Sequence, residues 1–397
     1  MFETITLFDD LVVILRRSIA MKHMIKYSVV LFLFLINILS SAAIAKSTDT
    51  LIKQEDMLLW YDARYLDVEG KGWTDTNSFY DRLPAKAEDI VRKAVWNLSR
   101  HSAGMCVRFV SDANEIRARW ELRSKSLAMP HMPATGVSGL DLYVKGMDGK
   151  WKWLAVGRPT KFPVNSVTLV KDIPEGRREY FLYFPLYNGV LSVEIGVPKG
   201  SVFRKATPYP KERKPIVFYG TSITQGGCAS RTGMVHTAIL GRRFHYPVIN
   251  LGFSGNGRME PEMADLLAEL DPSVYVLDCL PNMNGAMVTE LVAPFVKRLR
   301  KEHPETPILL VEDRTYSDAF FIRSRRQRNI ENRKELHHVY SGLKSEGIKD
   351  LHYLSGNRLL CDDLDNLATV DGSHPTDLGF LRQADAFYEV LKPILLR

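Results

Sequence analysis

The second half of the chain alternates short apolar runs with longer segments of helical periodicity. The apolar runs are rich in β-branched residues and predict buried strands, and the amphipathic segments that follow them predict helices. Regular alternation of this kind favours a parallel, doubly wound α/β sheet with right-handed crossovers. The expected strands are 215–219, 247–251, 273–279, 307–311 and 351–354, and the expected helices are 232–244, 261–270, 288–301, 323–345 and a last one from about residue 377.

The first half shows a different pattern, in which every second residue of short segments is apolar. In segment 115–123, for example, Ile116, Ala118, Trp120 and Leu122 alternate with polar residues. Short alternating strands separated by turns predict a β-sandwich of the jelly-roll type, and most of the aromatic side chains are expected in its core. The expected strands are 105–110, 115–123, 139–145, 151–156, 167–170, 180–186 and 191–197, with a short helix within 84–99.

These patterns divide the chain into four parts. Residues 1–45 are interpreted as an N-terminal extension and signal peptide, and residues 46–205 as the β-sandwich domain. Residues 206–214 combine proline with charge and have no periodicity, which predicts a linker. Residues 215–397 form the expected α/β domain.

Residues 21–45 have the three parts of an export signal. A basic start, Met21–Lys26, precedes an apolar run from Val29 to Leu39, and Ala43-Ile44-Ala45 provides a small-x-small cleavage site. The run is short for a membrane span, so we expect export to the periplasm or the exterior without a stable span. An uncleaved N-terminal anchor is the alternative. Because the preceding residues contain acids, translation is expected to start at Met21 or Met24.

Composition and charge narrow the possible partners only slightly. The 397 residues are 45% apolar and 25% charged, as in ordinary globular proteins, and the net charge of +7 allows anionic glycans as partners without requiring them. The basic cluster of Arg323, Arg325, Arg326 and Arg328 has no interleaved aromatic residues, which favours a solvated helix face over a nucleic-acid site.

The cysteines give no sign of a metal centre. Cys106, Cys228, Cys279 and Cys361 lie far apart and show neither CxxC nor Cys/His metal-ligand spacing, so no metal or other cofactor is predicted. An exported protein can form disulfides, but the spacing does not decide between pairing and free buried thiols.

One serine lies at the expected carboxyl end of a strand of the parallel sheet. Gly220-Thr221-Ser222 follows the first expected strand of the α/β domain and precedes a helical segment. Ligands of such sheets bind at the carboxyl ends of the strands, and a serine there can act as a nucleophile when a base reaches it.

The expected base is His374. Asp371 lies three residues before it, in a glycine-containing loop that precedes the last helix. An aspartate at this spacing can hold one imidazole nitrogen, fix the tautomer and leave the other nitrogen to accept a hydroxyl proton. A capping aspartate beside a surface histidine is the alternative. Ser222, His374 and Asp371 are therefore the candidate nucleophile, base and orienting acid.

Three groups at strand ends can donate hydrogen bonds to an oxyanion. They are the backbone N–H of Ser222, the backbone N–H of Gly255 and the side-chain amide of Asn282. Thr221, Glu312, Asp313 and Arg314 also follow expected strands; they either line the pocket or, for the last three, form a structural ion pair.

The order of these motifs resembles that of the SGNH (GDSL-type) hydrolase superfamily. Gly220-Thr221-Ser222 is similar to its first block, with Thr221 where aspartate is usual, and Gly255 falls on the second block. Asn282 falls on the third, although Leu280–Met283 departs from the usual Gly-x-Asn-Asp, and Asp371 with His374 matches the last. In addition, Gly139–Tyr143 resembles the GxDLY motif of a β-domain that precedes one subgroup.

The resemblance implies a flavodoxin-like fold, a metal-free serine esterase mechanism and, frequently, removal of acetyl groups from carbohydrate. We therefore expect an exported esterase acting on an acylated glycan or another small ester. Two alternatives stay open: an acyltransferase that uses the same three residues, and a glycan-binding protein with a vestigial hydrolase domain. A lipase is disfavoured because the sequence has no long apolar lid.

Overall fold

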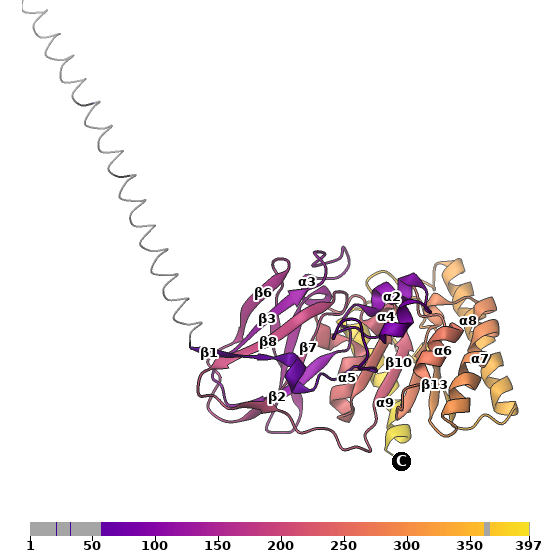
Figure 1. The fold of residues 1–397 in the computed structure, drawn as a ribbon. Coiled ribbons are helices and arrows are strands. Elements are labelled where there is room, and N and C mark those ends of the chain that lie inside the picture. Colours follow the sequence, from indigo (N-terminus) through magenta and orange to yellow (C-terminus); the bar gives the residue numbers. More distant parts are fainter. Residues whose placement is uncertain (1–20, 22–31, 33–56, 361–365, 397) are drawn as a thin grey trace, which may run out of the picture. The chain divides into compact units, whose positions relative to one another are not determined.

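The α/β region of the computed structural model is a parallel sheet of five strands (Figure 1). Their order is β11-β10-β12-β13-β14, the flavodoxin-like arrangement in which the first strand along the chain lies inside the second, so the predicted fold is confirmed. Gly220 pairs with Gly252 and with Asp278, which aligns the carboxyl ends of three neighbouring strands. The strands are β10 (Ile216–Gly220), β11 (Val248–Gly252), β12 (Val274–Asp278), β13 (Ile308–Val311) and β14 (Leu351–Leu354).

Helices cover both faces of this sheet. The core on one face includes side chains of α6 (Pro261–Leu267), α7 (Gly285–Glu302) and α8 (Arg323–Ser345). The core on the other face includes side chains of α5 (His236–Phe244) and α9 (Asp377–Leu395). The predicted bounds of α8 are confirmed. The helix expected from residue 232 begins only at His236, because Val235 is extended and separates it from a short 3₁₀ turn.

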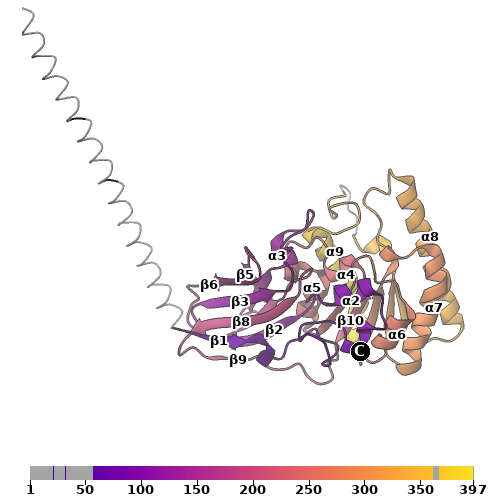
Figure 2. The same ribbon diagram turned by 45° about the horizontal axis from the view of Figure 1, so that its top comes forward.

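The structure describes residues 21, 32, 57–360 and 366–396. Before the parallel sheet, two further sheets have the strand orders β1-β8-β3-β6 and β5-β4-β7-β2-β9 (Figure 2). Strand pairs such as β2 with β7 and β3 with β8 are antiparallel, which confirms the predicted β-rich region. The strands are β1 (Leu58–Asp62), β2 (Cys106–Ser111), β3 (Ile116–Leu122), β4 (Leu140–Lys145), β5 (Trp151–Gly157), β6 (Val164–Val170), β7 (Arg178–Tyr183), β8 (Val190–Pro198) and β9 (Phe203–Lys205).

The β-rich and α/β regions share contacts within one compact unit that begins at Leu59. Trp73 and Trp96, which precede β2 in the chain, belong to the same core as Tyr219 of β10. Helix α2 (Lys93–Ser99) carries Trp96 and lies beside α4 (Ser222–Gln225) in both ribbon views (Figures 1 and 2). The predicted domain limits 46–205, 206–214 and 215–397 stay predictions, because this core crosses them.

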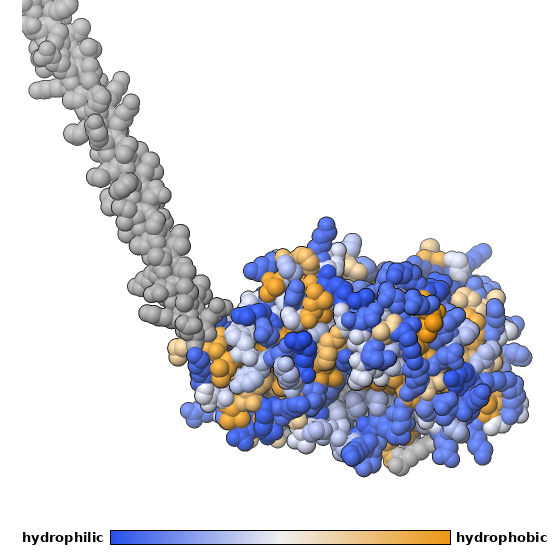
Figure 3. Space-filling view, viewed as in Figure 1, coloured by the Kyte–Doolittle hydropathy of each residue, from blue (hydrophilic) through white to orange (hydrophobic). Residues whose placement is uncertain are grey.

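The visible surface is mostly polar, with small scattered apolar areas (Figure 3). In the described ranges, every helix is too short or too polar to traverse a bilayer. Cys106, Cys228 and Cys279 are free and buried, and Cys361 lies outside the described residues. The predicted signal segment, 21–45, also lies outside them apart from Met21 and Phe32.

Candidate active site

Ser222 is the first residue of α4, directly after the turn that ends β10. Thr221 caps this short helix, with its side chain accepting from the Ile223 N–H at 3.3 Å. A side chain at position 220 would come within 2.2 Å of the Thr224 hydroxyl, so only glycine allows the chain to turn here. Ser222 is nine-tenths buried in this turn.

Hydrogen-bond distances connect Ser222 to His374 and His374 to Asp371. The Ser222 Oγ lies 2.8 Å from His374 Nε2, and His374 Nδ1 lies 2.8 Å from Asp371 Oδ2. An ionised carboxylate only accepts hydrogen bonds, so Nδ1 carries the imidazole proton and Nε2 is free to accept the serine proton. This geometry allows a histidine to deprotonate a serine hydroxyl.

The short loop before α9 keeps Asp371 ionised. Burial alone would raise the pKa of Asp371, but hydrogen bonds from the His374 and Ser373 N–H groups and from the imidazole hold that pKa below its usual value. The side chains of Asp371 and His374 are 45% and 26% exposed. Water and a substrate can therefore reach the histidine.

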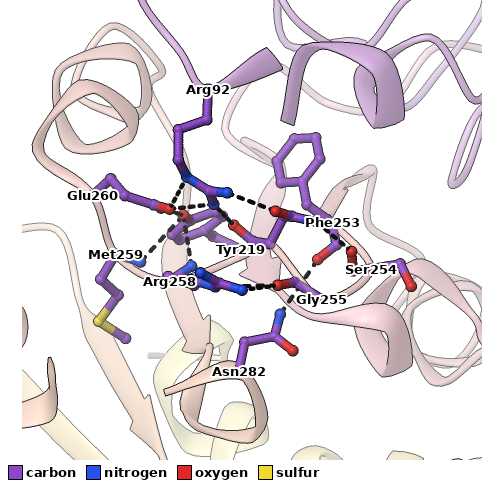
Figure 4. A network of polar contacts seen from close by, with 10 residues as sticks. Arg92, Tyr219, Phe253, Ser254, Gly255, Arg258, Met259, Glu260 and Asn282 are labelled. Carbon is purple, nitrogen blue, oxygen red and sulfur yellow. Dashed lines mark hydrogen bonds and ion pairs between the residues drawn. The ribbon is translucent and has the colours of Figure 1, made fainter. Parts of the chain in front are cut away.

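The three candidate oxyanion donors come from neighbouring strand ends. Asn282 follows β12, and its Nδ2 lies 3.4 Å from the Phe253 carbonyl oxygen, which places the amide beside the loop of Gly255 (Figure 4). Gly255 has a φ of +68°, and Arg258 donates to its carbonyl oxygen. Among the described residues, the N–H groups of Ser222 and Gly255 have no protein acceptor. The structure thus brings Asn282 and Gly255 together at the strand ends where Ser222 lies.

The four expected pocket residues are buried, and the side chains of Thr221, Arg314 and Glu312 form hydrogen bonds inside the protein. Arg314 is 1% exposed and donates to Asp278 at 3.1 and 3.2 Å, so the ion-pair interpretation fits it better than a pocket role. The Glu312 carboxylate accepts from Tyr353, Ser355 and the Gly356 N–H, which fixes the chain after β14. Asp313 and Thr221 are likewise buried.

Helix α8 anchors two of the site's loops, a role the sequence analysis missed. Arg325 donates to the Asp371 carbonyl oxygen at 3.2 Å and pairs with Asp318. Arg328 donates to the carbonyl oxygens of Pro281 and Met283, on either side of Asn282. Two of the four arginines of the basic cluster therefore point toward the site rather than into solvent. The only sign of this in the sequence is that the cluster follows a strand-end loop.

The β-rich region also reaches the site. Tyr187 donates to the Ser222 carbonyl oxygen at 2.9 Å, and Gln225 donates to the Leu186 carbonyl oxygen at 3.0 Å. The exposed His131 ring lies 6.0 Å from the His374 ring. No local pattern distinguishes Tyr187 or His131, because only packing between segments far apart in sequence brings them to the site.

Two further features lie away from the serine. A cavity of about 840 Å³ lies between the β4–β5 hairpin and helices α5 and α9, and neither Ser222 nor His374 lines it. Within the described ranges, no three His, Cys, Asp or Glu side chains are grouped so that they could hold a metal ion.

Two family models match the chain, one over each of its two regions. Residues 213–392 match the GDSL-like lipase/acylhydrolase family, and residues 58–203 match the GxDLY family, described as the N-terminus of SGNH hydrolase-type esterases. A search of curated proteins finds no match.

Several solved structures resemble the chain. A GDSL-like lipase from Bacteroides ovatus is 33% identical, with a TM-score of 0.80 over 85% of this chain and 98% of that one. The salicylyl-acyltransferase SsfX3 of a tetracycline biosynthetic pathway is 19% identical (TM-score 0.66; 86% and 99% covered). A family two carbohydrate esterase from Cellvibrio japonicus is 13% identical (0.54; 85% and 98%). The last two share only the fold. The chain belongs to the GDSL-like lipase/acylhydrolase (SGNH-type) family, in the form that carries a GxDLY N-terminal domain.

Proposed function

We propose that this esterase-family protein is an exported serine esterase that removes short acyl groups, most simply acetyl, from carbohydrate. The observation that carries the proposal is the chain of 2.8 Å contacts from Ser222 through His374 to Asp371. The fold shared with a carbohydrate esterase and the open position of His374 support a glycan ester as substrate.

In the proposed reaction, His374 takes the proton of Ser222 as its Oγ attacks the ester carbonyl. The N–H groups of Ser222 and Gly255 and the Asn282 amide stabilise the oxyanion. His374 then gives the proton to the leaving alcohol, and an acyl-enzyme forms. His374 next deprotonates a water molecule that attacks the acyl carbonyl, and the protonated imidazole returns its proton to Ser222 as the acid leaves.

Acetate release from a panel of acetylated polysaccharides tests this proposal. Ser222→Ala is expected to lose activity by at least about 10³-fold, because no other group replaces the nucleophile. Ser341→Ala, which removes an exposed serine hydroxyl of α8, is the matched control. Equal activity of Ser222→Ala and wild type would refute the mechanism, and hydrolysis of long-chain esters only would refute the glycan substrate.

Export is a separate part of the proposal and rests on the sequence of residues 21–45. Cleavage after Ala45 would give a mature chain starting at Lys46, followed by the proposed β-sandwich domain, linker and hydrolase domain. Mass spectrometry of protein recovered outside the cytoplasm tests this. An intact N-terminus on membrane-bound protein would favour the uncleaved anchor instead.

A further inference from the structure

The Gly139–Tyr143 motif of β4 faces the loop that follows the nucleophile helix. The carboxylate of Asp141 is fully buried and accepts three hydrogen bonds, each of 2.9 Å. One comes from the Trp153 indole on the neighbouring strand β5. The other two come from the Arg231 guanidinium and the Gly233 N–H. A buried carboxylate of the β-rich region therefore accepts two hydrogen bonds from one loop of the α/β region.

Two other residues of the motif, Tyr143 and Gly139, also take part in the close packing around Asp141. The Arg231 guanidinium also donates to the Tyr143 hydroxyl, two residues after Asp141 on the same face of the strand. A side chain at position 233 would come within 2.4 Å of the Tyr143 ring and 2.8 Å of the Asp141 carboxylate. A side chain at position 139 would meet the Thr135 and Gly157 carbonyl oxygens at 2.5 and 2.8 Å. Gly233 thus lets the Tyr143 and Asp141 side chains approach its backbone, and Gly139 lets two backbone carbonyl oxygens approach its own.

The same loop connects the motif to the helix that follows His374. Ser230, next to Arg231, donates its N–H at 2.9 Å and its hydroxyl to the carboxylate of Asp377. Asp377 is the first residue of α9 and lies three residues after His374. Thr135, from the β-rich region, donates to the Ser230 carbonyl oxygen at 2.5 Å. The loop is thus held from both sides at Ser230 and Arg231.

At its other end, the loop lies against the backbone of Ser222 and the ring of His374. The Gly226 and Gly227 N–H groups donate to the Ser222 carbonyl oxygen at 3.0 and 2.8 Å. A side chain at position 227 would come within 3.3 Å of the His374 ring. Residues 226–233 therefore run from the serine, past the histidine, to the helix behind it.

We propose that Asp141 and Arg231 are positioning residues that set the spacing between Ser222 and His374. They do so through the loop 226–233, which we name the relay loop, and its Ser230–Asp377 contact. The inference rests on the proposed function of Ser222 and His374. It assigns to the GxDLY motif a role in catalysis by the neighbouring domain, beyond stabilising the interface.

Proton transfer requires the serine oxygen to stay within hydrogen-bond reach of the imidazole, and small misplacements of reacting groups lower rates steeply. A purely structural ion pair predicts a different outcome, because loss of stability alone leaves the turnover of folded enzyme unchanged. The maximal turnover number kcat of folded variants therefore separates the two roles.

The first experiment measures kcat and KM for a short activated ester in Asp141→Asn, Arg231→Met and the double variant, beside circular dichroism and thermal unfolding. We expect kcat to fall about ten-fold or more in each single variant, with little change in KM. The double variant should fall no further, because both residues act through one contact. Unchanged kcat in folded single variants would overturn the proposal.

Glu69→Gln is the matched control. Glu69 is a mostly buried carboxylate of the β-rich region that pairs with Arg108 and has no contact with the relay loop. We expect kcat to stay within two-fold of wild type, because the contacts of Glu69 lie away from the relay loop. An equal loss of kcat in Glu69→Gln would show that general destabilisation explains the effect, and would overturn the proposal.

Ser230→Ala serves if the substitutions at Asp141 or Arg231 prevent folding. It removes only the hydroxyl contact with Asp377 and is expected to lower kcat several-fold. Hydrogen exchange gives a readout independent of catalysis: Asp141→Asn or Ser230→Ala should speed exchange in the relay loop and in residues 374–380, whereas Glu69→Gln should not. Unchanged exchange would overturn the inference, while activity retained by Ser222→Ala would refute only the proposed function.

Discussion

The serine and the histidine of the site are held by different parts of the chain. The nucleophile side, Ser222 with the relay loop, is enclosed by the β-rich region through Tyr187, Asp141 and Thr135. The base side consists of the loops that carry Asn282 and the Asp371–His374 pair, and α8 holds both with Arg328 and Arg325.

The two sides differ in burial and in the kind of group that holds them. Ser222 is nine-tenths buried, whereas the His374 and Asp371 side chains are 26% and 45% exposed. On the base side, guanidinium groups bind backbone carbonyl oxygens, which suits irregular loops because one planar fork serves several acceptors. We infer that changes on the base side lower turnover with little loss of stability, while changes on the nucleophile side lower both.

The largest expected effect is that of Asp371→Asn. The amide cannot hold Nδ1–H as an acceptor of the same strength, so we expect kcat to fall about 10³- to 10⁴-fold. Thermal unfolding should change little, because the side chain is half exposed. Steady-state kinetics with an acetyl ester measures the fall, and Asp385→Asn is the control, because it removes only an exposed ion pair between α9 and Arg243. A fall below ten-fold would remove Asp371 from the mechanism.

The direction of the Asp371 pKa shift adds a pH test. The pKa is below its usual value of 3.8, so the stabilising contact is complete above that value and is lost as pH falls through the lower, folded-state pKa. Asp371 therefore stays ionised between pH 7 and 5, and any stability that its ionised contacts add over Asp371→Asn should be lost only below pH 3.8. A difference in the free energy of unfolding between wild type and Asp371→Asn that shrinks already between pH 7 and 5 would contradict this assignment.

Asn282→Ala tests the oxyanion role within the base side. Removing one donor is expected to lower kcat by about 10²- to 10³-fold without destabilising the protein. Asn284→Ala is a close control, because that residue caps α7 by accepting from the Met287 N–H. It should cost about 1 kcal/mol of stability and leave kcat unchanged. The opposite pattern would assign Asn282 a structural role.

Arg328→Met asks whether α8 positions the Asn282 loop. Loss of the contacts to the Pro281 and Met283 carbonyl oxygens should release the loop and lower kcat about ten-fold, since displaced oxyanion donors act less well. Arg326→Met, in the exposed neighbouring position, is the control for charge. Equal kinetics of both variants would remove the anchoring role of α8 and leave the base side without its proposed support.

Tyr187→Phe tests the nucleophile side with the mildest change. The phenylalanine loses one hydrogen bond to the Ser222 carbonyl oxygen, which still accepts from the Gly226 and Gly227 N–H groups. We expect a loss of about 1 kcal/mol in the free energy of unfolding and a two- to five-fold lower kcat. Chemical denaturation and kinetics measure both, with exposed Tyr65→Phe as the control. A change in kcat without any change in stability would contradict the proposed contrast between the sides.

The comparison also explains what the sequence could predict. Most strands and the shared edge of the candidate site loops follow from local periodicity and from the rule that parallel strands end at one edge. The flavodoxin-like strand order was implied only by the family resemblance. Strands β1 and β9 escaped prediction because each is short and mostly not buried, so neither shows a clear apolar pattern. The contacts that hold the site loops were not predicted, because each joins segments far apart in sequence.

Arg328 and Asp141 show two ways in which a long-range contact escapes prediction from sequence. In the sequence, Arg328 is one of four basic residues on a polar helix, and only the packing of α8 brings it to the Asn282 loop. Asp141 belongs to a motif that the sequence did reveal, yet its partners Arg231 and Gly233 lie about ninety residues away. Motifs marked the candidate reacting residues, whereas long-range packing determined which groups hold them.

Asp313 gives the smallest expected effect on kcat, and it tests whether a buried carboxylate near the base side affects stability without affecting catalysis. Its side chain is 2% exposed, and its Oδ2 lies 3.9 Å from Arg328 Nε but has no hydrogen-bond partner among the described residues. Burial raises the pKa of Asp313 to about 6, although Arg314, Arg328 and Arg333 oppose the shift. Between pH 4 and 6 the folded protein therefore binds a proton that the unfolded chain has lost, so stability falls as pH rises and stays lower above pH 6.

Asp313→Asn removes this titration, because an amide keeps the neutral form at every pH. At pH 7.5 we expect the variant to gain roughly 1–3 kcal/mol in the free energy of unfolding over wild type, and the gain to vanish near pH 4. Denaturant unfolding at several pH values measures it, with Asp271→Asn, which removes only an exposed pair with Lys214, as the control. Its kcat should stay within two-fold of wild type. A less stable variant at pH 7.5 would mean that the attraction of the three arginines outweighs the cost of burying the charge, so that Asp313 would itself hold α8 in place.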